Sequence, residues 1–318
     1  MNPWFSSLSR LERFSWVLAL GVAMGMVIGT FFLPGGDDLY RYYIPFENGC
    51  LNCGYVPYYA QWFLFPLHML PEYPYAWPVW TIINILGFLA LAYITGANPF
   101  LFMISFPMLG QMWLGQIDML ICLGLVIVLY ARNLYVRGFG IMLTLIKPQL
   151  MILPLLLLLL LEKPKSTGKL LIVPVLLLLL SIIVYGPTWP MDWISNAMQY
   201  LPIHVWRLAS IDIWKFGIFL LPLPLLVKDP KKRLETGLLV SALATPFFGV
   251  YSYVIFLMLN TKWWTIVLSY AWIAAYFWLG ENAMRFAWIL PLTMLIMMMY
   301  DLWVETQKVK LGNAISIN

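Results

Sequence analysis

Two adjacent carboxylates, Asp37 and Asp38, follow the first apolar segment of the chain after a Pro-Gly-Gly turn. Ionisable groups at the end of a membrane helix are costly and are usually kept for function. Three interpretations fit the pair: a general base that accepts a proton from a substrate hydroxyl, a site for a divalent cation, or acids in a solvated loop. The residues alone leave these three open.

Lys147-Pro148-Gln149 places a cation and an amide inside an apolar stretch. A lysine at the centre of a membrane helix costs about 2.5–3.5 kcal/mol. Lys147 therefore either lies at the tip of a broken helix, where it would suit an anionic headgroup or phosphate, or extends its side chain to the interface. Further along, Arg207 presents a planar fork suited to phosphate, whereas Lys215, beside a tryptophan, fits an interface anchor equally well.

Three weaker signals accompany these groups. Gly115-Gln116-Ile117-Asp118 is either a polar helix start or part of a cavity wall, and His204 is either structural or catalytic. Cys50 and Cys53 form a single CxxC that lacks the second half of a zinc site, so we favour a disulfide in an oxidising compartment. The sequence has no P-loop or dinucleotide-binding fingerprint, which argues against a soluble nucleotide donor.

The composition predicts that these groups are embedded in a membrane protein. The chain is 62% hydrophobic and 10% charged, with a mean hydropathy of +0.83, whereas soluble domains carry about 25% charged residues. We expect an all-α, polytopic transmembrane helical bundle that forms a single domain over residues 1–318. The net charge of +5 is accounted for by loops on one side of the membrane and gives no reason to expect a nucleic-acid partner.

The apolar segments are uneven in length. A helix of about ten residues rises only ~15 Å, half of the ~30 Å hydrocarbon layer, and such breaks are tolerated only beside protein or a water-filled cavity. Breaks at Pro148 and Pro246 therefore predict a cavity cut into one side of the bundle. About 10–12 membrane segments are expected, near 14–33, 77–95, 99–110, 117–131, 138–147, 149–161, 169–187, 211–227, 234–246, 251–261, 263–280 and 284–303.

The distribution of basic residues sets the expected orientation. With the N-terminus in the cytoplasm, fourteen of the nineteen Lys and Arg residues fall on the cytoplasmic side, as the positive-inside rule requires. The agreement needs a hairpin that turns at Lys147-Pro148. This orientation places both termini of the multi-pass protein in the cytoplasm and the longest loops, 34–76 and 188–210, outside. We assign the protein to the plasma membrane of a prokaryote. The five exceptions are Arg41, Lys147, Arg207, Lys215 and Arg285.

Four stretches carry a family resemblance in a fixed order, with Thr245-Pro246 and Tyr251 as a fainter fifth. They are Asp37-Asp38-Leu39-Tyr40-Arg41-Tyr42-Tyr43, the pair Tyr55-Val56-Pro57-Tyr58 and Phe65-Pro66-Leu67, Gly115-Gln116-Ile117-Asp118, and Gly140 through Lys147-Pro148. In this order they resemble the GT-C superfamily of membrane glycosyltransferases, in its polyprenyl-phosphate-mannose-dependent mannosyltransferase-like branch. The resemblance covers roughly residues 14–165 well and the rest loosely.

The resemblance implies a GT-C-like fold with a large first extracytoplasmic loop and an inverting sugar transfer outside the cytoplasm. Mannose or another hexose would pass from a polyprenyl-phosphate donor to a hydroxyl of a lipid or glycan acceptor, with surrounding membrane lipids as further partners and no cofactor. A divalent metal at the carboxylates is not favoured. The implied general base is Asp38, preferred because Tyr42 follows it by four residues, or Asp37. The implied donor-phosphate ligands are Lys147, Arg207 and Lys215, and the implied substrate ligands are Tyr42, Gln116, Asp118, Gln149, His204 and Tyr251.

Two other classes of protein remain as rivals. A transporter or flippase of a lipid-linked sugar or small anion also uses broken helices, but it should show two related halves, and the first outer loop has no counterpart in the second half. A scaffold without activity would tolerate loss of both Asp37 and Asp38.

Overall fold

The chain is described by a computed structural model that covers residues 9–204, 212–245 and 248–315. Helices are the regular structure of this part of the chain, and the described residues include no β-strand. The prediction of an all-α protein is therefore confirmed.

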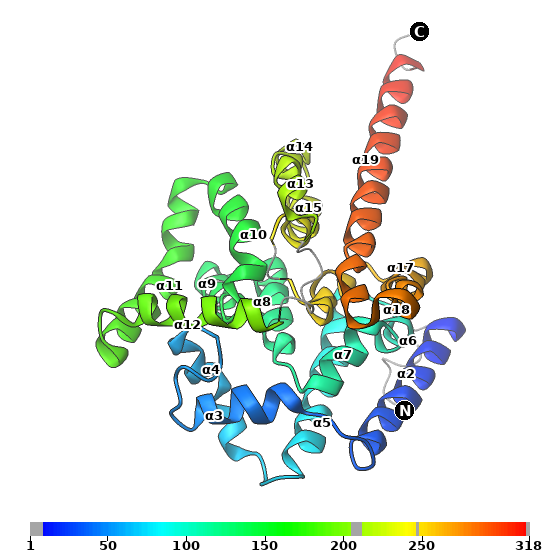
Figure 1. Ribbon diagram of the computed structural model, residues 1–318. Coiled ribbons are helices and arrows are strands. Elements are labelled where there is room, and N and C mark those ends of the chain that lie inside the picture. The colour runs from blue at the N-terminus through cyan, green and yellow to red at the C-terminus, as the bar shows by residue number, and fades with distance from the viewer. Residues whose placement is uncertain (1–8, 205–211, 246–247, 316–318) are drawn as a thin grey trace.

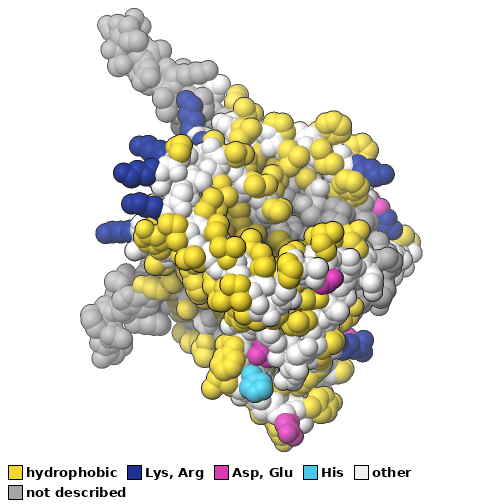
Figure 2. Space-filling model, turned by 90° about the vertical axis from the view of Figure 1, so that its left-hand side faces the viewer, with side chains coloured by type: hydrophobic (Ala, Val, Ile, Leu, Met, Phe, Trp, Pro, Cys, Tyr) yellow, Lys and Arg dark blue, Asp and Glu magenta, His cyan; other side chains and the backbone are white. Residues whose placement is uncertain are grey.

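Four helices among the described residues are long and apolar enough to cross a membrane, in agreement with the prediction of transmembrane helices. The first and third are covered little by the rest of the protein and expose apolar side chains, as lipid-facing helices would. Figure 2 shows hydrophobic side chains over most of one face, with Lys and Arg gathered along its upper left edge. Three of the four are α2 (Arg10–Gly29), α5 (Ala76–Thr95) and α11 (Pro164–Tyr185). The fourth span, Asn282–Glu305, continues into α19 (Ile289–Ile315), which projects beyond the others in Figure 1.

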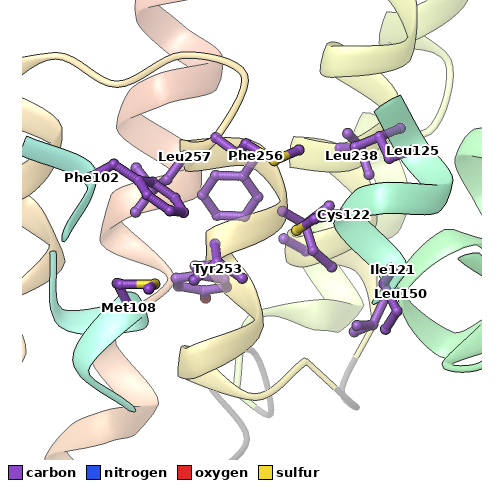
Figure 3. Packing of buried hydrophobic residues seen from close by; sticks show 14 of the residues in the cluster. Phe102, Met108, Ile121, Cys122, Leu125, Leu150, Leu238, Tyr253, Phe256 and Leu257 are labelled. Carbon is purple, nitrogen blue, oxygen red and sulfur yellow. The ribbon is translucent and has the colours of Figure 1, made fainter. Parts of the chain in front are cut away.

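Shorter helices fill the space between the long ones, and their buried side chains form the larger of two apolar cores. Figure 3 shows how Phe102, Cys122 and Tyr253 meet there with neighbours from other short helices. Five of these helices are α6 (Pro99–Met103), α7 (Phe106–Leu114), α8 (Asp118–Tyr130), α10 (Pro148–Leu161) and α15 (Pro230–Ala244). The short turns η6 (Val250–Tyr253) and α16 (Val254–Leu257) follow α15 in the chain and pack against α7 and α8, respectively.

Two segments that were predicted to be long are broken into pieces. Near 211–227, Pro222 and Pro224 lack the amide N–H that continues a helix, and the described part is divided into α13 (Trp214–Gly217), η5 (Ile218–Leu220) and α14 (Leu223–Leu226). Near 263–280 the chain turns between α17 (Trp263–Ser269) and α18 (Ile273–Leu279). There the hydroxyl of Tyr270 donates to the carbonyl of Ile104, and Trp272 packs against Phe106.

The prediction that residues 188–210 form a loop was also wrong, because most of this range is the helix α12 (Trp189–His204). Pro190 lies in the first turn, where its missing N–H costs nothing. Trp193, Ile194, Ala197 and Met198 follow at helical spacing and give the helix one apolar face. In Figure 1, α12 runs across the molecule at a steep angle to α10 and α19.

The first predicted outer loop, 34–76, is folded into short turns around a second apolar core. Tyr43, Phe46 and Tyr59 are buried in that core with Trp77 of α5 and Trp189 of α12. The turns are η1 (Leu39–Tyr43), α3 (Ile44–Glu47), η2 (Tyr58–Ala60), α4 (Gln61–Leu64) and η3 (Phe65–Met69).

The predicted break at Lys147-Pro148 is present. Helix α9 (Leu134–Thr144) ends four residues before Pro148, at which α10 begins. Helix α15 ends at Ala244, and Pro246, the other predicted break, lies outside the described residues. The break at Lys147 leaves that side chain at the meeting point of two short helices.

Glycines set the close packing of α9 between its neighbours. A Cβ at Gly140 would lie 2.8 Å from the carbonyl oxygen of Gly124 in α8, and one at Gly138 would lie 2.5 Å from the carbonyl oxygen of Leu170 in α11. Real side chains essentially never approach a backbone atom this closely. The helix that leads to Lys147 is therefore positioned by backbone-to-backbone contact on both sides.

We expect Gly140→Ala to destabilise the protein by about 1–3 kcal/mol, because the added methyl group overpacks the α8–α9 contact. Gly168→Ala in α11 is the matched control, since nothing lies within 4 Å of a Cβ there. The control should be neutral or stabilising by up to about 1 kcal/mol, because alanine favours a helix over glycine. Thermal unfolding of both variants in detergent micelles measures the difference. Equal effects would contradict the proposed close contact.

Candidate functional site

A cavity of about 240 Å³ lies where the first folded loop meets the α9–α10 break, η6 and α12. Its charged lining residues within the described chain are Asp38 and Lys147, and α12 contributes an apolar wall of Trp193, Ile194 and Met198. The structure brings together six of the residues predicted from the sequence. They are Asp38, Tyr42, Gln116, Lys147, Gln149 and Tyr251.

The two adjacent carboxylates have different surroundings. Asp38 is 2% exposed and lines the cavity. Asp37 has a side chain that is 45% exposed, and a carboxylate oxygen lies 3.3 Å from Nε of Arg41. Successive residues of a helical turn project about 100° apart, so the two cannot share one face. The structure therefore places Asp38 at the cavity and leaves Asp37 outside it.

Gln116 joins the two charged groups of the cavity. Its Nε2 donates to Oδ2 of Asp38, while its Oε1 accepts from Nζ of Lys147 at 2.7 Å and from the hydroxyl of Tyr43 at 2.8 Å. The side chain is only 1% exposed. The indole of Trp80 donates to the backbone carbonyl of Gln116 at 3.1 Å and fixes the main chain. One amide therefore links a carboxylate to an ammonium group.

Asp118, predicted as a substrate ligand, pairs with Lys147 and is not among the residues that line the cavity. The two side chains form a buried ion pair, 0% exposed for Asp118 and 6% for Lys147. The other oxygen of Asp118 accepts from Nε2 of Gln111 at 2.7 Å and from Oγ of Ser252 at 2.6 Å. A buried carboxylate with this many partners is a structural anchor for the cation.

Aromatic side chains complete the surroundings of the ammonium group. Nζ of Lys147 lies 5.1 Å from the ring centre of Tyr251, within the range of a cation–π contact. The hydroxyl of Tyr59 donates to the carbonyl of Leu145 at 2.6 Å, two residues before Lys147. Burial raises the pKa of Tyr59 above its usual value, so that this hydroxyl stays a donor.

Two glycines bring Asp38 to Gln116. Gly115 ends α7 with a positive φ of 68°, and a Cβ there would lie 2.7 Å from Cβ of Leu39. Gly36 also has a positive φ, 75°, and its N–H donates to the carbonyl of Trp113 at 2.8 Å. Other residues adopt such backbone angles at a cost. The close contact places η1, and with it Asp38, directly on the α7–α8 turn.

The remaining predicted residues are not brought to the cavity by the described structure. Lys215 is exposed on α13 and is not among the lining residues. Arg207 lies outside the described residues, and His204 is the last residue of α12, with a side chain outside the described part. Cys50 and Cys53 are joined as a disulfide in the first loop, near the cavity wall at Gly54 and Tyr55.

Several residues of the site were not predicted from the sequence. Gln111, Tyr43 and Ser252 hold the polar network, and the apolar face of α12 forms a wall. The repeat of apolar residues three to four positions apart after Pro190 is a signal that would have revealed α12. The three polar residues carry no such signal, because their partners are distant in sequence.

No group of three or more His, Cys, Asp and Glu side chains in the described chain is arranged to hold a metal ion. We compared the chain with protein-family models, with curated protein sequences and with solved structures, and none of them matches it. Any inference about function therefore rests on the residues and geometry of the cavity.

We expect Lys147→Met to destabilise the protein by about 3–5 kcal/mol, because it leaves the buried carboxylate of Asp118 without its cation. The double variant Lys147→Met/Asp118→Leu should recover most of that loss. Lys232→Met is the control, since its pair with Glu305 is 38% and 59% exposed and should contribute at most about 1 kcal/mol. Unfolding in detergent micelles measures all three. A single Lys147 variant as stable as the control would contradict the anchor role.

Proposed function

We propose that the chain is a membrane glycosyltransferase with a GT-C-like fold. It would transfer mannose or another hexose from a polyprenyl-phosphate donor to a hydroxyl of a lipid or glycan acceptor, with inversion at the anomeric carbon. The observation that carries the proposal is one cavity that holds a buried carboxylate, Asp38, and a buried ammonium group, Lys147, with an apolar wall beside them.

In this mechanism Asp38 accepts the proton of the acceptor hydroxyl. The acceptor oxygen forms a bond to the anomeric carbon as the bond from that carbon to the phosphate oxygen breaks, and the polyprenyl phosphate leaves with the bonding electrons. Negative charge that develops on the leaving phosphate is stabilised by a fixed cation nearby. We assign that role to Lys147.

The bonding of Lys147 supports this assignment. An ammonium group has three N–H donors, and the side chains of Gln116 and Asp118 account for two of them. A further donor is left for a phosphate oxygen in the cavity that Lys147 lines. The apolar wall from α12, with Trp193, Ile194 and Met198, suits the lipid part of such a donor.

The proposal includes a membrane orientation. The basic residues of the α8–α9, α10–α11 and α14–α15 connections would face the cytoplasm, in agreement with the positive-inside rule. The cavity would then face the outside of the plasma membrane of a prokaryote, beneath the first large extracytoplasmic loop. About 10–12 membrane segments, several of them half-length, would form the bundle.

We expect Asp38→Asn to lower sugar transfer by about 10²–10⁴-fold, the usual contribution of a general base. Asp37→Asn is the matched control and should retain activity within a few fold, because Asp37 pairs with Arg41 outside the cavity. The assay uses purified full-length protein, a short-chain polyprenyl-phosphate mannose and a panel of lipid and glycan acceptors.

Two outcomes would overturn the proposal. Undiminished transfer by Asp38→Asn would place the base elsewhere. Donor binding by the wild-type protein with no transfer to any acceptor would favour a transporter or flippase of lipid-linked sugar, which movement of a labelled donor across liposomes would then reveal.

A further inference from the structure

We propose that Gln116 is a positioning residue that holds the Asp38 carboxylate ionised and aimed into the cavity, and that couples it to Lys147 through one side-chain amide. The assignment of Asp38 as a base rests on the proposed function. The hydrogen-bonded link itself rests on the side-chain contacts alone.

The orientation of the amide is determined by its partners. Lys147 has donors and no acceptor, so it requires the oxygen of Gln116, and the hydroxyl of Tyr43 donates to the same oxygen. The amide nitrogen must then point to the carboxylate of Asp38. A reversed amide would place N–H groups against the ammonium group and an oxygen against the carboxylate. One orientation therefore satisfies all three neighbours.

The link favours the charged form of Asp38. Burial opposes ionisation of a carboxyl group, whereas a donated hydrogen bond stabilises the carboxylate. The cation at the oxygen end of Gln116 polarises the amide, and this polarisation strengthens the bond that its nitrogen donates. Lys147 thus acts on Asp38 through Gln116, although Asp118 is its direct ion-pair partner.

The backbone leaves Gln116 little freedom to move. Its N–H donates to the carbonyl of Gln111 at 3.0 Å, and its carbonyl accepts from the indole of Trp80. It follows Gly115, whose positive φ ends α7. A residue held in this way can fix the direction of a partner side chain.

The ionisable groups around Asp38 can be named for the described part of the chain. Asp37 on the same segment pairs with Arg41, and the cavity residues that α12 contributes carry no ionisable side chain. The titratable side chains that share the cavity with Asp38 are Tyr42, Tyr43, Tyr55, Lys147 and Tyr251, with Asp118 behind Lys147.

Gln116→Glu keeps the hydrogen-bond acceptor that faces Lys147 and removes the donor that faces Asp38. Its carboxylate can still accept from Lys147 and Tyr43, but it faces Asp38 with a like charge instead of a donor. We expect the midpoint for protonation of Asp38 to rise by at least about one pH unit. Gln116→Met removes the donor without adding charge and should raise the midpoint by a smaller amount. It also provides a second variant of similar shape should the first fail to fold.

The midpoint is measured by pH-difference infrared spectroscopy of the purified full-length protein in micelles. The carboxyl band of Asp38 is assigned by its loss on Asp38→Asn in each background. Gln199→Met is the control, because Gln199 is exposed on α12 and does not line the cavity; its midpoint should equal that of the wild type. A midpoint unchanged in both Gln116 variants would overturn the proposal.

The pH dependence of transfer separates this proposal from the function it rests on. In the Gln116 variants, the pH midpoint of the acid limb of the kcat profile should rise together with the infrared midpoint. If Gln116 had only a structural role, its loss would lower kcat at every pH and leave the midpoint of the acid limb unchanged. If the infrared midpoint shifts in the Gln116 variants but the wild-type protein transfers no sugar, the proposed function is refuted and the role of Gln116 is supported. Active wild-type protein with an unmoved limb and midpoint would refute the role of Gln116 alone.

Discussion

The buried ion pair between Lys147 and Asp118 is the interaction on which the rest of the site depends. Removing each charge from water costs several kcal/mol, and the cost is recovered only where both groups are fully surrounded by partners. Gln111, Gln116 and Ser252 supply those partners from α7, the turn before α8 and η6. The pair can therefore form only when these segments and the α9–α10 break meet, which makes the location of the cavity a consequence of satisfying two charges.

Close backbone packing makes that meeting possible. Glycines let α9 approach α8 and α11, and they let η1 rest on the α7–α8 turn. The break at Pro148 then leaves Lys147 at the junction instead of inside a continuous helix. The polar network and the glycine contacts constrain each other, because a wider spacing between the helices would leave the ammonium group without its carboxylate.

Sequence reasoning reached the outline of this arrangement. The proline at 148 and the short apolar segments predicted the helix break. Residue type singled out the Asp37–Asp38 pair, Gln116 and Lys147, and the structure brings Asp38, Gln116 and Lys147 into one cavity. It did not distinguish Asp118 from a ligand, because whether a carboxylate faces a cavity or supports a neighbour depends on packing. Helix α12 was missed although apolar residues recur three to four positions apart after Pro190. The turn that divides the segment near 263–280 depends on contacts of Tyr270 and Trp272 with residues distant in the sequence, which local sequence patterns do not reveal.

The charges of the described cavity residues bear on the proposed function. Asp118 already offsets the charge of Lys147, and Asp38 adds a negative charge on the other side of Gln116. A small free anion would meet repulsion from Asp38 wherever it diffused in so small a space. A molecule pair that brings a phosphate to the side of Lys147 and a neutral hydroxyl to the side of Asp38 would satisfy both ends at once. The transfer proposed above, from a lipid phosphate to a hydroxyl, would bring these two groups together in this way.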